Sequence, residues 1–304
     1  MKTSLDHLPE KKQRELARVV NILHEEFEDA VAGGTAEFKK KGRILKIILF
    51  GSYARGDWVD EPHTRKGYRS DYDLLIVVNN RKLTDFATYW AKAQDRLLRD
   101  RGVKTLTNFV VHSRREVNTA LREGQYFFSD IRRDGIVLYE LDDEPLAEPK
   151  SLTPAEAWRV ATEHFTNHFP FAQGLMRGVP MQMKDRMYKI AAFMLHQAVE
   201  QAYATLLLVL TNYTPSSHNL SFLRGLAEGK DRRLAEAWPR DQHRHTAWFN
   251  RLNEAYVKAR YSKHYEISEE ALVWLADRTA RLHELVEQVC REHLARLKEA
   301  AERS

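Results

Sequence analysis

The residues of this chain with the clearest chemistry are two aspartates spaced two positions apart, Asp71 and Asp73. They open an apolar run that predicts a strand from Tyr72 to Val78. Side chains at i and i+2 of a strand point to the same face, so the two carboxylates should lie side by side. Adjacent carboxylates repel each other unless a cation lies between them, and Mg²⁺ prefers oxygen ligands. The spacing therefore predicts that Asp71 and Asp73 bind Mg²⁺.

A glycine-serine turn lies upstream of the two aspartates. Gly51 and Ser52 directly follow a second apolar run, Ile44 to Phe50, which predicts another strand. Glycine lets the backbone approach a phosphate closely, and serine adds a hydroxyl donor at the start of a predicted helix. We therefore expect Gly51 and Ser52 to bind the phosphates of a nucleotide.

In this order, the two motifs resemble the signature of the nucleotidyltransferase superfamily with the polymerase-beta-like core. Gly51-Ser52 and Asp71-x-Asp73 take the signature positions, and Ala54-Arg55-Gly56 matches the form of small bacterial members. The resemblance implies transfer of a nucleoside monophosphate, with AMP as first candidate, from Mg²⁺-bound ATP or another NTP to a hydroxyl. It also implies that Asp71 and Asp73 are catalytic and that Arg55 contacts the nucleotide.

A long insert from Asp57 to Arg69 separates the two motifs and departs from the family pattern. We expect it to form an extended loop over the site. Its Lys66 and Arg69 are candidate phosphate contacts, and the alternative is that both are ordinary solvated charges.

The third acid of the superfamily is missing from its expected strand, which runs from Leu106 to Val111. In the family that acid serves as metal ligand or general base. Asn108 is the nearest polar residue, and an amide orients a hydroxyl but accepts no proton at neutral pH. His112 is a weaker candidate because it lies at the strand end. The sequence leaves open slow catalysis with Asn108 in the site, or nucleotide binding without turnover.

The coarse pattern predicts an α+β chain with two domains. Residues 1–140 are expected to form a mixed sheet with flanking helices, beginning with an amphipathic helix from Leu16 to Val31. Residues 141–154 carry three prolines among acidic residues and are expected to be a linker. Residues 155–304 show only helical periodicity and predict a helical bundle. The predicted elements are helix 84–101, strands 106–111 and 136–139, and helices 154–177, 182–210, 218–228, 240–261 and 268–299.

The helical half resembles the HEPN domain, which often accompanies minimal nucleotidyltransferases. The resemblance rests on the segments 195–203, 213–220 and 256–267. Many HEPN domains are RNases with an arginine followed four to six residues later by a histidine. Here Arg260 and His264 are one residue too close, with Tyr265 next. Arg260 and His264 share a face, and could form a composite site, only if the helix that contains Arg260 continues through His264. We favour the alternative that Arg260 packs locally at the end of this helix.

Composition adds few constraints. The chain has 48 Lys and Arg against 43 Asp and Glu, a net charge of +5 that is compatible with nucleotide or RNA partners. Its single cysteine, Cys290, excludes an internal disulfide. The N-terminus lacks the apolar core of a signal peptide. The apolar stretch from Tyr203 to Leu210 is too short to span a membrane and predicts part of a buried core helix. A cytoplasmic location is the default expectation.

Three functions remain open at this stage. The first is an enzyme that transfers a nucleotide to a small hydroxylated molecule or to a protein hydroxyl, as toxin-antitoxin relatives do. The second is a HEPN-type RNase that the nucleotidyltransferase half regulates. The spacing of Arg260 and His264 disfavours this function, and it equally disfavours RNA as a partner. The third is a non-catalytic nucleotide-binding module. The HEPN resemblance also implies a homodimer.

Overall fold

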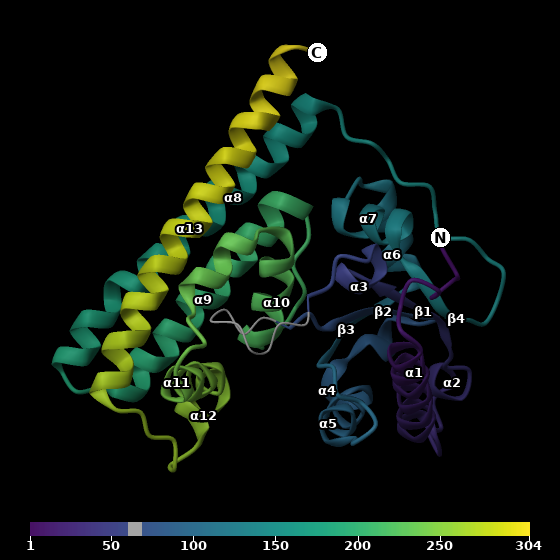
Figure 1. Cartoon of the computed structure of the whole chain (residues 1–304), viewed down its shortest axis with the longest axis horizontal. Helices are drawn as coiled ribbons and strands as arrows, with labels where there is room; N and C mark the ends of the chain where they lie inside the picture. Colours follow the sequence, from purple (N-terminus) through teal and green to yellow (C-terminus); the bar gives the residue numbers. More distant parts are fainter. Residues whose placement is uncertain (60–68) are drawn as a thin grey trace. The chain divides into compact units, whose positions relative to one another are not determined.

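The computed structural model describes residues 1–59 and 69–304, so Lys66 and the centre of the predicted insert lie outside the described residues. The described chain divides into two units, 1–59 with 69–151, and 152–304. The first combines a sheet with helices and the second is helical (Figure 1). The predicted α+β fold class is confirmed.

A four-stranded mixed sheet forms the centre of the first unit. Its strands are β1 (Ile44–Phe50), β2 (Tyr72–Val78), β3 (Thr107–Ser113) and β4 (Ile136–Glu140), in the order β3-β2-β1-β4. β1 is antiparallel to β2 and β4, whereas β2 is parallel to β3. β1 and β2 begin and end where their apolar runs do, because almost every residue in both is buried.

Helices cover both faces of this sheet (Figure 1). Leu74, Ile76 and Val78 of β2 belong to the core that packs against α1 (Glu10–Val31), α4 (Phe86–Tyr89) and α5 (Ala91–Arg99). The other face meets α6 (Arg114–Arg122) and α7 (Tyr126–Asp134), where Phe50 contacts Phe127. Asp73 alternates with Leu74 and therefore lies on this second face.

The single helix predicted over 84–101 is wrong. The structure has a 3₁₀ turn, η1 (Arg81–Thr84), then α4 and α5, with the break at Trp90. The Trp90 indole is fully buried and donates to the carbonyl of Leu83 at 2.8 Å. Asp85 caps α4 by accepting from the backbone N–H of Thr88 at 2.8 Å. The cap and the buried indole favour two short helices over one continuous helix.

The second unit is built on three long helices, α8 (Pro154–Lys184), α9 (Tyr188–Thr211) and α13 (Glu269–Glu302). Shorter elements complete it: α10 (Leu220–Lys230), η2 (Arg232–Ala237), α11 (His243–Asn253) and α12 (Ala255–Tyr261). α8 begins at a capping box in which Thr153 and Glu156 bond each other's backbone N–H. The described residues of this unit contain no strand, as predicted.

Two further predictions for this unit have clear outcomes. The continuous helix expected over 240–261 is wrong, because the structure divides it at Glu254 into α11 and α12. Within the described chain, only α9 is long and apolar enough to cross a membrane, and 67% of its apolar window is buried. Burial by neighbouring helices confirms that 203–210 belongs to a core helix.

Candidate active site

The two sequence motifs meet at one end of the sheet, where β1 ends and β2 begins. Phe50, the last residue of β1, pairs with Asp73 of β2, and Gly51 follows directly. On the other side, Asp73 pairs in parallel with Asn108 of β3. Three adjacent strands thus place Gly51, Asp73 and Asn108 in neighbouring positions.

Gly51 approaches the carboxylate of Asp73 more closely than any other residue type could. Its backbone has φ +75° and ψ −152°, a conformation that is essentially restricted to glycine. A Cβ atom added at Gly51 would lie 2.7 Å from Oδ2 of Asp73. Both the conformation and the contact therefore require glycine at the turn.

The two carboxylates interact electrostatically. Burial, followed by the negative charge of Asp71, raises the pKa of Asp73 well above its usual value. A hydrogen bond from Asn108 and the charge of Arg55 offset part of this shift. Asp71 and Asp73 are therefore poised to gain from a nearby cation, which would relieve their repulsion.

Asn108 lies beside the carboxylate pair, on the strand where the family resemblance implies a third acid. Its Nδ2 donates to Oδ2 of Asp71 at 3.1 Å, and it lies beside Asp73 in the sheet. His112 is remote from this end of the sheet, because it pairs with Val77 near the other end of β2. Its ring packs against Phe128, and burial lowers its pKa. Asn108 rather than His112 is the β3 residue at the carboxylate pair.

The remaining predicted nucleotide contacts lie on α3 (Ser52–Arg55) and beside the insert. Ser52 begins this short helix directly after Gly51. Arg55 pairs with Asp57, with Nη2 3.3 Å from Oδ1. Arg69 is exposed and lies at the described end of the insert, next to Ser70.

Glu15, a buried acid on α1, supports the site but was not predicted from the sequence. It accepts from the backbone N–H of Thr105 at 2.6 Å and from the hydroxyl of Tyr72 at 3.1 Å. Burial alone would raise the pKa of Glu15, but the N–H donors of Thr105 and Lys104 outweigh it and lower the pKa. Because Tyr72 lies between Asp71 and Asp73, Glu15 anchors the start of β2. In the sequence, Glu15 can be recognised only as an acidic residue next to the apolar face of the first helix.

The part of the sequence that forms this site is similar to known nucleotidyltransferases. The family model described as "Nucleotidyltransferase domain" matches residues 35–127. A relative from Methanocaldococcus jannaschii, named "Putative protein adenylyltransferase", is 39% identical over 101 residues, which cover 33% of this chain and 84% of the relative.

The chain belongs to the nucleotidyltransferase family. Residues 181–289 match a second family model, "HEPN domain", within the helical unit. The protein is therefore a transferase with a nucleotidyltransferase domain followed by a HEPN domain, as the two resemblances implied.

The donor set of the nucleotidyltransferase domain fits Mg²⁺. Asp71 and Asp73 offer carboxylate oxygens, and because burial and the charge of Asp71 raise the pKa of Asp73, a cation would stabilise its charged form. Among the described residues, no group of three or more His, Cys, Asp or Glu side chains is arranged to hold a metal. A metal at this site would therefore depend on Asp71, Asp73 and oxygens of the bound nucleotide.

The HEPN domain does not bring Arg260 and His264 onto one helical face. α12 ends at Tyr261, and Ser262 is extended, so the continuous helix that a composite site requires is absent. Arg260 instead donates from Nε to the carbonyl of Tyr256 at 2.6 Å and stacks over its ring at 4.2 Å. His264 is exposed, whereas Tyr265 is buried and its hydroxyl donates to the carbonyl of Arg251.

Proposed function

We propose that this protein transfers AMP from Mg²⁺-bound ATP to a hydroxyl acceptor at the Gly51–Asp73 end of the sheet. The observation that supports this most is the close approach of Gly51 to Asp73, 2.7 Å for a notional Cβ. It brings the backbone of the Gly51–Ser52 turn, the expected phosphate contact, directly beside the carboxylate pair that would hold Mg²⁺. The choice of AMP follows the name of the M. jannaschii relative.

In this proposal the chain's own residues position the nucleotide and orient the acceptor. The backbone of Gly51 and the hydroxyl of Ser52 bind phosphate oxygens, and Arg55 and Arg69 add positive charge. Asp71 and Asp73 hold Mg²⁺, which when bound neutralises charge on the α-phosphate and on the pyrophosphate leaving group.

The bond changes are those of an in-line displacement. The acceptor oxygen forms a bond to the α-phosphorus, the bond from that phosphorus to the bridging oxygen breaks, and pyrophosphate leaves. Asn108 can orient the hydroxyl but cannot accept its proton at neutral pH. The proton therefore passes to water, and we expect transfer to be slow, by about 10²–10⁴-fold relative to a site with a well-placed base.

The acceptor class and the role of the HEPN domain belong to the same proposal. The relative's name favours a protein hydroxyl as acceptor. A small hydroxylated molecule is the other candidate. The HEPN domain would bind the acceptor or the nucleotide. We further propose a cytoplasmic homodimer, in line with the sequence-based expectation.

The RNase function finds less support in the described HEPN residues. Arg260 is engaged by Tyr256, and the hydroxyl of Tyr265 is engaged by Arg251. His264 lies beyond the end of α12. No observation here favours RNA cleavage at these three residues over nucleotide transfer at the sheet.

Product analysis tests the proposed reaction without knowledge of the acceptor. Purified protein is incubated with Mg²⁺ and ATP labelled on either the α- or the γ-phosphate. The proposal expects the α-label in AMP or in an AMP adduct of the protein itself, and the γ-label in pyrophosphate. Release of ADP and inorganic phosphate would contradict it, because that outcome is phosphoryl rather than nucleotidyl transfer.

A further inference from the structure

The N-terminal segment, residues 1–9, lies beside the short helix α3 and is itself held in place. Near its start, Lys2 donates its backbone N–H to the carbonyl of Gly135 at 3.1 Å, next to β4. Near its end, Leu8 is buried in the core of the sheet domain. His7 therefore lies on a stretch of chain whose path is set by the fold.

His7 contacts α3 directly. Its Nε2 lies 2.7 Å from the carbonyl oxygen of Tyr53, the residue after Ser52. A carbonyl can only accept, so Nε2 carries a proton and donates it to this bond. The ring also lies against the end of α3, because its Cδ2 would be 3.6 Å from a Cβ added at Gly56. One imidazole thus contacts α3 at two points.

The carbonyl that His7 binds has no other donor in the backbone. α3 has only four residues, Ser52–Arg55, and Gly56 ends it with φ +91°. The next two N–H groups along the chain both donate to the carbonyl of Ser52, at 2.9 and 3.1 Å. Among the described residues, no backbone N–H donates to the carbonyl of Tyr53. The last carbonyls of a helix need partners from outside it, and His7 supplies one.

The side chain of Tyr53 is held from the other side. It is only 1% exposed, and its ring stacks on Trp58 with centroids 5.5 Å apart and planes 11° apart. Its centroid is 4.6 Å from that of Tyr72, and Nζ of Lys12 lies over the two tyrosine rings at 5.4 and 5.6 Å. His7 meets the Trp58 ring edge-on, with centroids 6.1 Å apart. The core therefore fixes the ring of Tyr53, and His7 fixes its carbonyl.

A single turn of helix depends on such contacts. Forming one turn costs more free energy than its few hydrogen bonds return, so α3 keeps its place only through the rest of the fold. Tyr53 is bonded to Ser52, and Gly51 adjoins the carboxylate of Asp73. A movement of α3 would therefore shift the turn relative to the carboxylate pair. A turn that is already ordered loses less entropy when it binds a phosphate.

We infer that His7 is a positioning residue for the phosphate-binding turn. Its Nε2–H holds the carbonyl of Tyr53 and thereby orients the backbone of Gly51 and the hydroxyl of Ser52 toward the phosphates of ATP. The inference rests on the proposed function, which assigns phosphate binding to this turn. His7 acts on the turn rather than on the reacting atoms, so it should change the KM for ATP and leave kcat unchanged.

Two variants separate the hydrogen bond from the bulk of the ring. His7→Gln keeps an N–H donor near the position of Nε2, whereas His7→Leu fills similar space without a donor. In AMP transfer, His7→Leu should raise the KM for ATP about three- to tenfold at unchanged kcat, and His7→Gln should restore the KM. Asp6→Asn, at the exposed neighbouring position, is the matched control and should change neither constant. An unchanged KM in His7→Leu, a loss of kcat alone, or no rescue by His7→Gln would overturn the inference.

Hydrogen exchange tests the same contact without turnover. The amides of Arg55, Gly56 and Asp57 donate the hydrogen bonds that close α3. In nucleotide-free protein they should exchange about three- to tenfold faster in His7→Leu than in the natural chain, and His7→Gln should restore protection. If the natural chain releases ADP instead of AMP, the proposed transfer fails, and this exchange pattern still decides whether His7 holds α3. Unchanged exchange in folded His7→Leu protein would refute the positioning role.

Discussion

At the scale of single residues, the candidate active site depends on two positions, Gly51 and Asn108. Gly51 excludes a side chain because the space of a Cβ is filled by Asp73, and Asn108 replaces an acid that would add a third negative charge. Strand alternation predicted that Asp71 and Asp73 lie side by side, and the family resemblance implied that Gly51 and Asn108 lie with them. The contact of Gly51 with Asp73 was not predictable, because it depends on the pairing of Phe50 with Asp73 across two strands.

Gly51→Ala tests the turn. Alanine at φ +75° is strained, and its Cβ would displace the carboxylate of Asp73. We expect a loss of about 1–3 kcal/mol in unfolding free energy and loss of detectable AMP transfer. Denaturant unfolding and the labelled-ATP assay measure the two effects. Gly229→Ala on α10, where an added Cβ meets nothing within 4 Å, is the matched control.

Asn108→Asp tests whether the missing acid limits the rate. It would add a proton acceptor next to Asp71 and Asp73, so transfer should accelerate by about 10²-fold at saturating Mg²⁺. Without Mg²⁺ the third charge should lower stability, because three carboxylates would repel one another. An unchanged or lower rate at saturating Mg²⁺, in folded protein, would show that the proton acceptor is not limiting.

At the scale of elements, helix α1 and strand β2 are joined by one buried acid. Glu15 binds the hydroxyl of Tyr72 and the backbone that leads into β3, so it fixes the start of both strands at the site. The apolar runs predicted β1 and β2 well because both faces of these strands are buried. Periodicity missed the breaks at Trp90 and Glu254, where tertiary packing and caps override a continuous helical pattern.

Glu15→Gln measures this connection. The amide keeps one oxygen for the two backbone N–H groups, but it places an NH₂ group where Oε2 accepts from the hydroxyls of Tyr72 and Thr105, and it removes the buried negative charge. The expected cost is about 2 kcal/mol of unfolding free energy, with a higher KM for ATP because Asp71 and Asp73 lose their anchor. Glu28→Gln, an exposed position on the same helix, should change stability by less than about 0.5 kcal/mol. Equal effects of the two substitutions would contradict the anchoring role.

At the scale of the whole molecule, a buried histidine makes the stability of the HEPN domain depend on pH. Burial lowers the pKa of His196 to about 4, helped by the nearby charges of His218 and Arg260. The side chain is fully buried. The unfolded chain binds a proton near the ordinary histidine pKa of about 6.5, whereas the folded chain does not. Stability is therefore lost as pH falls from about 6.5 to about 4.

Between pH 7 and pH 5 this histidine should account for about 2 kcal/mol of lost unfolding free energy. Denaturant unfolding of the full chain at both pH values measures the loss. The variant His196→Gln removes the titrating group and should lose about 2 kcal/mol less over the same interval. An identical pH dependence in the two proteins would mean that other groups govern acid unfolding.

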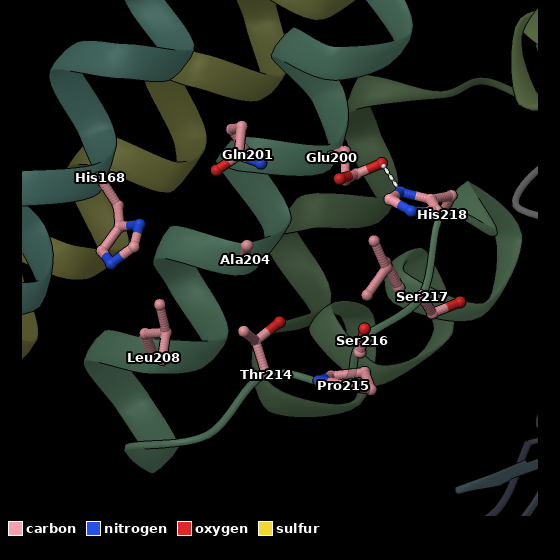
Figure 2. Close-up of a pocket in the computed structure, with 11 residues that line it drawn as sticks. His168, Glu200, Gln201, Ala204, Leu208, Thr214, Pro215, Ser216, Ser217 and His218 are labelled. Atoms are coloured by element: carbon pink, nitrogen blue, oxygen red, sulfur yellow. Dashed lines mark hydrogen bonds and ion pairs between the residues drawn. The ribbon is translucent and has the colours of Figure 1, made fainter. Parts of the chain in front are cut away.

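The division into an α+β half and a helical half was visible in the sequence, because periodicity changes at the proline-containing segment 141–154. The contact of Glu200 with His218 was not visible, because these residues come from separate segments that only the folded domain brings within 2.9 Å (Figure 2).

The most direct test of the central claim compares AMP transfer in four proteins: the natural chain, Asp71→Asn, Asp73→Asn and the exposed control Asp95→Asn. Each is incubated with α-labelled ATP and Mg²⁺, and labelled AMP products are quantified. The account predicts a loss of about 10²-fold or more in both site variants, since each loses a charged metal ligand, and an unchanged rate in the control. Full activity in folded Asp71→Asn and Asp73→Asn proteins would show that transfer does not occur at this site.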